Sequence, residues 1–143
     1  MRRIPLEVYN FANGLRAVAH VILRVEGLPM LPIRAIVDTG SPVTLLGTLD
    51  TKRMRVSKLQ LNGLKGKNKP VNIGGGTITT KILEGAKLRF ADSFEVEMSV
   101  DFPIEGGENF SQPSLLGVDF MLAARAKLFF DPNNRKAYFE IEE

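Results

Sequence analysis

Apolar and polar residues alternate along most of this chain, which is the period-two pattern of β-strands that bury one face. The alternating runs are Ile4–Val8, Leu15–Val25, Ile33–Val37, Ala86–Phe90 and Phe94–Val100. Asn13-Gly14, between the first two runs, is a strong hairpin-turn signal. The pattern therefore predicts an all-β fold in which turns join successive strands.

One segment near the C-terminus departs from this alternation. Val118–Ala126 contains three alanines, and this composition favours a short helix. Asp119 would lie in the first turn of that helix, where a negative charge suits the helix dipole. Two final strands are expected at Leu128–Phe130 and Ala137–Ile141, with a turn at residues 131–134 between them.

The middle of the chain has a weaker pattern. A strand is expected at Val56–Leu61 and a basic, glycine-containing loop at Asn62–Pro70. Gly74-Gly75-Gly76 lies between two short runs, Val71–Ile73 and Thr77–Thr79. This arrangement predicts a hairpin with a glycine-rich tip.

Length and composition limit the possible classes of protein. The chain has 143 residues, 44% of them hydrophobic, so residues 1–143 are expected to form one domain with a substantial core. The lack of cysteine excludes disulfides, thiolate catalysis and cysteine metal sites. The net charge of +3 comes from scattered basic residues, which argues against nucleic-acid binding. No signal peptide or membrane-spanning run is visible, so we expect a cytoplasmic protein with no membrane partner.

Asp38 is the clearest candidate for catalytic chemistry. An apolar strand leads directly into Asp38-Thr39-Gly40-Ser41. A carboxylate at the end of a buried strand is costly unless it is hydrogen-bonded. Gly40 allows a sharp turn that brings a backbone N–H close, and the hydroxyls of Thr39 and Ser41 can also donate. From this motif alone, a turn in which Asp38 bonds only its own backbone is the simpler alternative.

The same stretch resembles the signature of the retropepsin-like aspartic peptidases, the single-domain relatives of pepsin that include the retroviral proteases. That signature is two apolar residues followed by Asp-Thr-Gly and a serine or alanine, and here it is Ile36–Ser41. The family's second signature, two apolar residues and a glycine that opens a short helix, is matched by Leu115-Leu116-Gly117. Ile73–Thr77 lies where the family has its glycine-rich flap. The matches cover nearly the whole chain in the expected order and spacing.

The resemblance implies a closed retropepsin-like β-barrel with one short C-terminal helix, assembled as a homodimer. It makes Asp38 the catalytic acid and base of an endopeptidase that hydrolyses extended polypeptide without a metal or cofactor. Such enzymes need two carboxylates that share one proton. Because this chain contains a single Asp-Thr-Gly, the pair would form across a twofold axis.

The resemblance also assigns roles around Asp38. Thr39 would brace the two active-site loops across the axis, while Gly40 and Ser41 would bond the carboxylate. The chain ends, Ile4–Val8 and Tyr138–Ile141, are candidates for an intersubunit sheet. From pattern alone they could equally be ordinary edge strands of the monomer.

Two further sets of residues receive roles in the same way. The flap residues that would close over an extended peptide are Ile73, Gly74, Gly75, Gly76 and Thr77. The residues that would support the active-site loop from beneath are Leu115, Leu116 and Gly117. Retroviral members often pair an arginine after the helix glycine with an acid just beyond the catalytic motif, but here Val118 follows the glycine and Pro42 and Val43 supply no acid. The dimer must therefore be braced differently.

Two other functions are compatible with the sequence. The missing ion pair and a flap tip without an aromatic residue are compatible with a non-catalytic peptide-binding or dimerisation module of the same fold. A stand-alone β-barrel that only resembles the family is the other alternative. His20, the only histidine, lies mid-strand and is expected to have a structural or surface role. No spacing typical of metal ligands is present.

Overall fold

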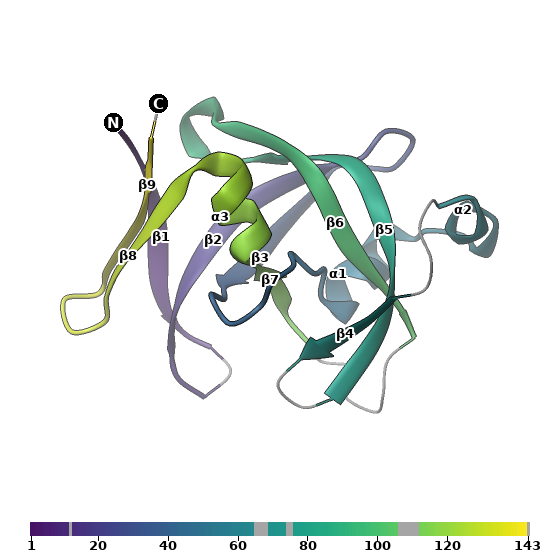
Figure 1. Ribbon diagram of the computed structural model, residues 1–143, viewed down its shortest axis with the longest axis horizontal. Helices are drawn as coiled ribbons and strands as arrows, with labels where there is room; N and C mark the ends of the chain where they lie inside the picture. Colours follow the sequence, from purple (N-terminus) through teal and green to yellow (C-terminus); the bar gives the residue numbers. More distant parts are fainter. Residues whose placement is uncertain (12, 65–68, 74–75, 106–111, 143) are drawn as a thin grey trace.

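The computed structural model describes residues 1–11, 13–64, 69–73, 76–105 and 112–142. Strands dominate it, as the alternation predicted (Figure 1). The elements in chain order are β1 (Arg2–Asn10), β2 (Leu15–Arg24), β3 (Leu31–Val37), α1 (Thr48–Met54), α2 (Lys58–Gly63), β4 (Lys69–Ile73), β5 (Gly76–Arg89), the 3₁₀ turn η1 (Ala91–Ser93), β6 (Glu95–Glu105), β7 (Ser114–Leu116), α3 (Val118–Ala124), β8 (Ala126–Asp131) and β9 (Lys136–Ile141). No helix in the described part of the chain is long and apolar enough to cross a membrane.

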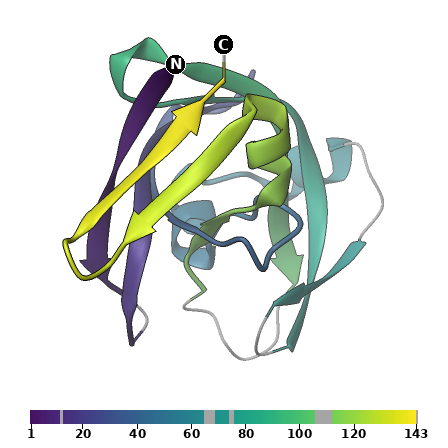
Figure 2. The ribbon, with the colours of Figure 1, turned by 60° about the vertical axis from the view of Figure 1, so that its left-hand side comes forward.

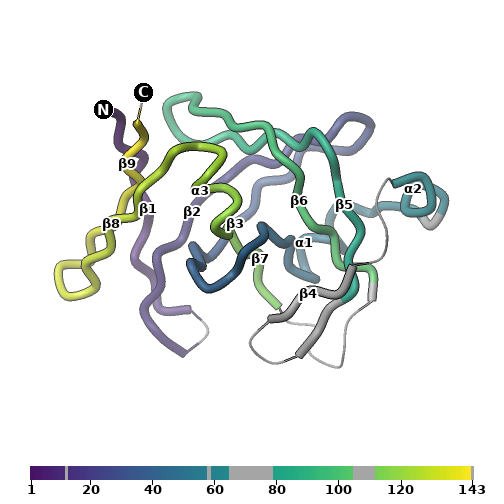
Figure 3. Tube along the Cα trace, in the orientation of Figure 1, coloured from purple at the N-terminus to yellow at the C-terminus, as the bar shows by residue number. Residues whose placement is uncertain are grey.

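The described strands pair into one sheet whose main path is β4-β5-β2-β1-β9-β8. Off this path, β3 pairs with β2 and β7, and β6 pairs with β5. Within the described residues the path stays open at β4 and β8, so the closed barrel expected from the sequence is not formed. The cause lies in β1, whose first half pairs with β9 and whose second half pairs with β2. The C-terminal hairpin therefore extends the sheet outward, opposite to β4 and β5 (Figure 1), and the two chain ends lie side by side (Figure 3).

Three aromatic rings fill the centre of the core. The Phe120 ring lies 5.1 Å from the Phe90 ring and 5.2 Å from the Phe139 ring, and all three side chains are buried. Phe120 belongs to α3 and Phe139 to β9, and Phe90 lies directly after the end of β5. This packing fixes α3, and with it the residues that precede the helix, against the strands.

The helices depart from the sequence expectations in three places. The predicted strand at Val56–Leu61 is wrong, because helix α2 occupies most of this segment. Its start is a capping box: Ser57 accepts from the Gln60 N–H and the Gln60 side chain accepts from the Ser57 N–H. Helix α1 was not predicted. Helix α3 is confirmed but ends at Ala124, because Arg125 adopts a left-handed conformation with φ 52° and β8 begins at the next residue.

The predicted hairpins agree with the strand pairing. In β4 and β5, Ile73 lies opposite Gly76, while Gly74 and Gly75 fall outside the described residues. The predicted turn after β8 is present. There, hydrogen bonds from the side chain and backbone of Asn134 lower the pKa of the Asp131 carboxyl below its ordinary value.

Candidate active site

Asp38 lies at the point where β3 ends and the chain enters a tight turn. Its backbone N–H donates to the carbonyl of Leu116 at 2.9 Å, which ties the turn to the end of β7. The Gly40 N–H donates to Oδ1 of the Asp38 carboxylate at 2.9 Å. Asp38 is half-buried, whereas Thr39 and Gly40 are exposed. The turn therefore holds the carboxylate in place while its surroundings stay open on one side.

Ser41 does not bond this carboxylate, although the sequence led us to expect it. Its hydroxyl donates to the Val43 carbonyl at 2.7 Å, and the residue is buried. Among the described residues, the one hydrogen bond to the Asp38 carboxylate is the bond from Gly40. Oδ2 is therefore available for a proton, a water molecule or a second carboxylate.

The two sequence motifs meet in space. Strands β3 and β7 run parallel, with Ile36 opposite Leu115 and Val37 opposite Leu116. The next residue, Gly117, lies directly against the loop after Asp38: a Cβ atom there would be 2.4 Å from the Val43 carbonyl oxygen. Only glycine permits this approach, so Gly117 sets the distance between the loop and α3.

A pair of residues that the sequence analysis missed links the same two segments. Thr44 donates to Asp119 twice, from its N–H at 2.9 Å and from its hydroxyl at 2.7 Å. The Thr44 hydroxyl in turn accepts the Gly117 N–H at 3.1 Å. Hydrogen bonds to an ionised carboxylate are about twice as strong as neutral ones. The Thr44–Asp119 pair thus braces, within the chain, the loop that lacks the arginine–acid pair of retroviral members.

The substitution Thr44→Val is expected to destabilise the fold by about 2 kcal/mol. Valine keeps the volume but removes one donor to Asp119 and leaves the buried Gly117 N–H without its acceptor. Urea unfolding of the variant measures this effect. Ser99→Ala, on the exposed face of β6, is the control and should change stability by less than about 0.5 kcal/mol. Equal midpoints for the two variants would contradict a bracing role.

The remaining candidates lie farther along the sheet. Ile73, Gly76 and Thr77 lie in paired strands β4 and β5. His20 is exposed on β2, and its Nε2 lies 3.0 Å from a carboxylate oxygen of Glu7. In the described residues, no group of three or more histidine, aspartate or glutamate side chains is placed to hold a metal ion.

Solved structures provide two comparisons that span most of the chain. The EIAV protease complexed with the inhibitor HBY-793 matches with a TM-score of 0.56 and 18% sequence identity, over 85% of this chain and 98% of that one. A retropepsin-like aspartic protease from Rickettsia conorii matches with a TM-score of 0.57 and 15% identity, over 96% of this chain and 89% of that one. No protein-family model and no curated protein matches the chain. The similarity of these backbones, together with the two motifs that meet at Asp38, shows that the chain has the retropepsin-like fold.

Proposed function

We propose that this chain is an aspartic endopeptidase whose catalytic pair forms when two copies bring their Asp38 carboxylates together. The observation that carries this proposal is the half-buried Asp38 carboxylate, held by the Gly40 N–H at the end of β3 in a retropepsin-like fold. One carboxylate cannot supply both a base and an acid at the same time, and a second one must come from another chain.

In the proposed reaction, the ionised Asp38 of one subunit removes a proton from a water molecule that attacks the scissile carbonyl carbon. The protonated Asp38 of the other subunit donates to the carbonyl oxygen. When the tetrahedral intermediate collapses, the C–N bond breaks and the amine leaves with a proton returned by the pair. The two apparent pKa values belong to the pair as a unit. Thr39 would brace the loops across the axis, and the β4–β5 hairpin with Ile73, Gly76 and Thr77 would cover an extended substrate.

The proposed partner surface differs from the one expected from the sequence. Tyr138–Ile141 is paired on both sides, because β9 lies between β1 and β8. Ile4–Val8 is paired on one side along its length, with β9 up to Leu6 and with β2 from Glu7. In the described sheet, β8 is the end strand beyond β9. Figure 2 shows the β8–β9 hairpin turned toward the viewer. An unpaired edge offers backbone N–H and C=O groups to another chain. We therefore assign the intersubunit sheet to β8 rather than to the chain ends.

Phe130 supports this assignment. Its cross-strand neighbour Ala137 is buried, so Phe130 projects from the core side of the hairpin, yet 39% of Phe130 is exposed. On the opposite face, Phe129 stacks on Tyr138 with ring centroids 4.7 Å apart. A second copy paired along β8 would cover the exposed ring of Phe130.

Phe130→Lys is expected to weaken dimerisation by at least about 30-fold, as is typical when a buried aromatic anchor is lost. Sedimentation equilibrium over a range of chain concentrations measures the effect. Leu122→Lys is the matched control, because Leu122 is 75% exposed on α3 and lies outside the hairpin. Dimers of unchanged affinity in the Phe130→Lys variant would exclude β8 as the interface.

Peptide-library cleavage from pH 4 to 7, with native and Asp38→Asn chains side by side, tests the function. Cleavage by the native chain alone supports the peptidase. Cleavage by both chains would overturn the role of Asp38. Peptide binding without cleavage by a confirmed dimer would support the non-catalytic module instead.

A further inference from the structure

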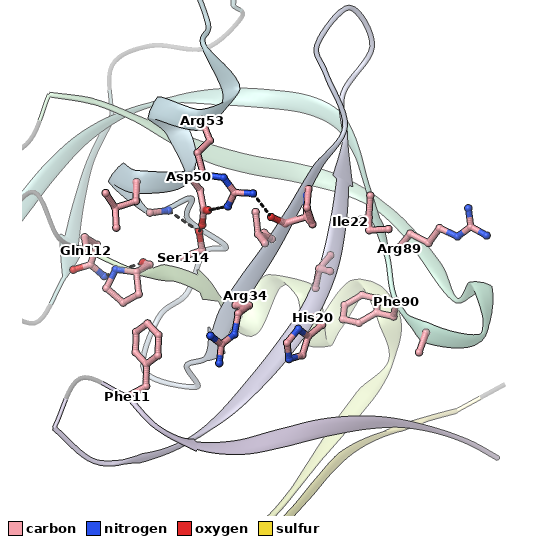
Figure 4. A pocket seen from close by; sticks show the side chains of 17 residues that line it. Phe11, His20, Ile22, Arg34, Asp50, Arg53, Arg89, Phe90, Gln112 and Ser114 are labelled. Atoms are coloured by element: carbon pink, nitrogen blue, oxygen red, sulfur yellow. Dashed lines mark hydrogen bonds and ion pairs between the residues drawn. The ribbon is translucent and has the colours of Figure 1, made fainter.

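A cavity of about 690 Å³ lies over the outer face of β2 and β3, and Asp38 is not among the residues that line it (Figure 4). Its floor is formed by cross-strand neighbours, with Ile22 opposite Pro32 and His20 opposite Arg34. Helix α1 forms one wall with Leu49, Asp50 and Arg53, and Gln112, Pro113 and Ser114 extend that wall. Cavities of about 300–1,000 Å³ are the size that accepts a small ligand or a few side chains.

Apolar side chains that are exposed to solvent line this cavity. Ile22 is 41% exposed and Leu49 is 64% exposed, and both face this one space. Phe11 and Pro113 add apolar surface at one end. Single exposed aliphatic residues are ordinary, but several around one concave space indicate a binding surface.

Basic side chains outnumber carboxylates among the residues that line this apolar floor. The described lining residues include three arginines, Arg34, Arg53 and Arg89, and one carboxylate, that of Asp50. Asp50 already accepts hydrogen bonds from Arg53 at 2.9 Å and from the Ser114 hydroxyl at 2.5 Å. The cavity is therefore complementary to an apolar ligand that carries negative charge.

Arg34 is the guanidinium best placed to meet such a ligand. It lies over the Tyr9 ring at 4.5 Å and its Nη2 is 3.9 Å from Glu7, which fixes its position on the floor. A guanidinium carries five N–H donors, so this one long ion pair leaves donors for a ligand carboxylate. In Figure 4, Arg34 and His20 project from the strands between Phe11 and Phe90.

The Phe11 end of the cavity adjoins the strands that carry the candidate active site. Phe11 packs on the cluster of Ile36, Leu45 and Leu115. Ile36 lies two residues before Asp38, and Leu115 lies two residues before Gly117. Phe11 therefore links one end of the cavity to the strands that position Asp38.

From these contacts we propose that the cavity is a second binding site for the polypeptide substrate, selecting an apolar segment flanked by carboxylates outside the cleaved bond. Its assignment to the substrate rests on the proposed peptidase function. The leucine or similar side chains of the segment contact Ile22 and Leu49, and a flanking carboxylate accepts from Arg34.

Binding can be tested without any cleavage. The probe is acetyl-Glu-Leu-Leu-Glu-amide, titrated into the Asp38→Asn protein and followed by ¹H–¹⁵N NMR. Backbone shifts are expected at Ile22, Arg34 and Leu49, with affinity about tenfold tighter than for acetyl-Gln-Leu-Leu-Gln-amide. Shifts confined to other parts of the protein, no shifts at millimolar peptide, or equal affinity for the two peptides would overturn the site.

Two matched variants locate the interaction. Leu49→Glu places a negative charge in the cavity wall and should weaken binding of the acidic probe by about tenfold. Leu59→Glu makes the same change on α2, where Leu59 is 83% exposed and does not line the cavity, and should leave binding unchanged. Equal weakening by the two variants would contradict the proposed location.

Attachment of Glu-Leu-Leu-Glu to a peptide that the native enzyme cleaves tests the link to the substrate. We expect KM to fall by about tenfold with kcat unchanged, and Leu49→Glu to remove the advantage. Probe binding with unchanged KM would confirm the cavity as a site but overturn its assignment to the substrate. Because the NMR arm needs no activity, it remains decisive if the chain proves not to be a peptidase.

Discussion

Mixing native chains with an excess of Asp38→Asn chains is expected to remove the proposed peptidase activity faster than simple dilution would. Asparagine cannot carry the shared proton or act as a base, and loss of a general acid or base costs up to about 10⁴-fold in rate. A mixed dimer has one carboxylate and one amide, so it should be nearly as inactive as the Asp38→Asn dimer. Activity then comes only from pairs of native chains.

Total activity is expected to depend on the square of the fraction of native chains. At equal amounts of the two chains, about one quarter of randomly formed dimers contain two native copies. Activity per native chain should therefore halve in that mixture, after dissociation and reassembly at constant total concentration. Initial rates on one library-derived peptide measure this over a series of mixing ratios.

Asp92→Asn provides the matched control for this mixing experiment. Asp92 is exposed in η1 at φ 59°, a conformation that asparagine tolerates well. Mixtures with Asp92→Asn chains should keep full activity per chain. If total activity falls only in proportion to the fraction of native chains when Asp38→Asn chains are added, each chain works alone. That result would exclude the shared-pair mechanism.

The parts of this site that the sequence predicted are the parts encoded locally. Asp38-Thr39-Gly40-Ser41 contains its own turn, and the Gly40 N–H reaches a carboxylate only two residues away. The alternating strands were predicted for the same reason, because burial of one face depends on neighbouring residues. Helix α2 could have been predicted as well, since Ser57 and Gln60 have the spacing of a capping box.

Contacts between distant residues could not be read in this way. Thr44 and Asp119 are separated by 75 positions, and nothing near either residue indicates the other. The open sheet depends on where the C-terminal hairpin pairs, which places β8 rather than β9 at one end of the described sheet. Ser41 donates to Val43 because the loop bends back on itself under Gly117, a packing effect that the motif does not contain.

Gly117→Ala is expected to destabilise the protein by about 3 kcal/mol or more and to abolish activity. The backbone of Gly117, at φ −94° and ψ −173°, is one that any residue adopts, so the requirement for glycine is one of space. An alanine Cβ would lie 2.4 Å from the Val43 oxygen and 2.7 Å from the Ser41 oxygen. Both contacts are with backbone, which cannot rotate away as a flexible side chain does.

Relief of this clash would break the hydrogen bonds that shape the loop after Asp38. The Ser41 carbonyl accepts the Val118 N–H at 2.9 Å, and the Gly117 N–H itself donates to Thr44. Moving the loop to admit a methyl group lengthens these bonds and shifts the turn that holds Asp38. Thermal unfolding followed by calorimetry, together with peptide cleavage, measures both consequences.

Gly63→Ala is the matched control, because it makes the same glycine-to-alanine substitution at an open position. No atom lies within 4 Å of a Cβ at Gly63, which is exposed in the last turn of α2. Alanine should therefore stabilise that helix by about 0.5–1 kcal/mol, opposite in sign to the effect at Gly117. If both variants unfold at or above the native temperature, the loop after Asp38 is not held by its contact with Gly117. A cooperative loss of stability and activity at Gly117 alone would show that the support beneath the carboxylate is a steric fit between the two backbone segments.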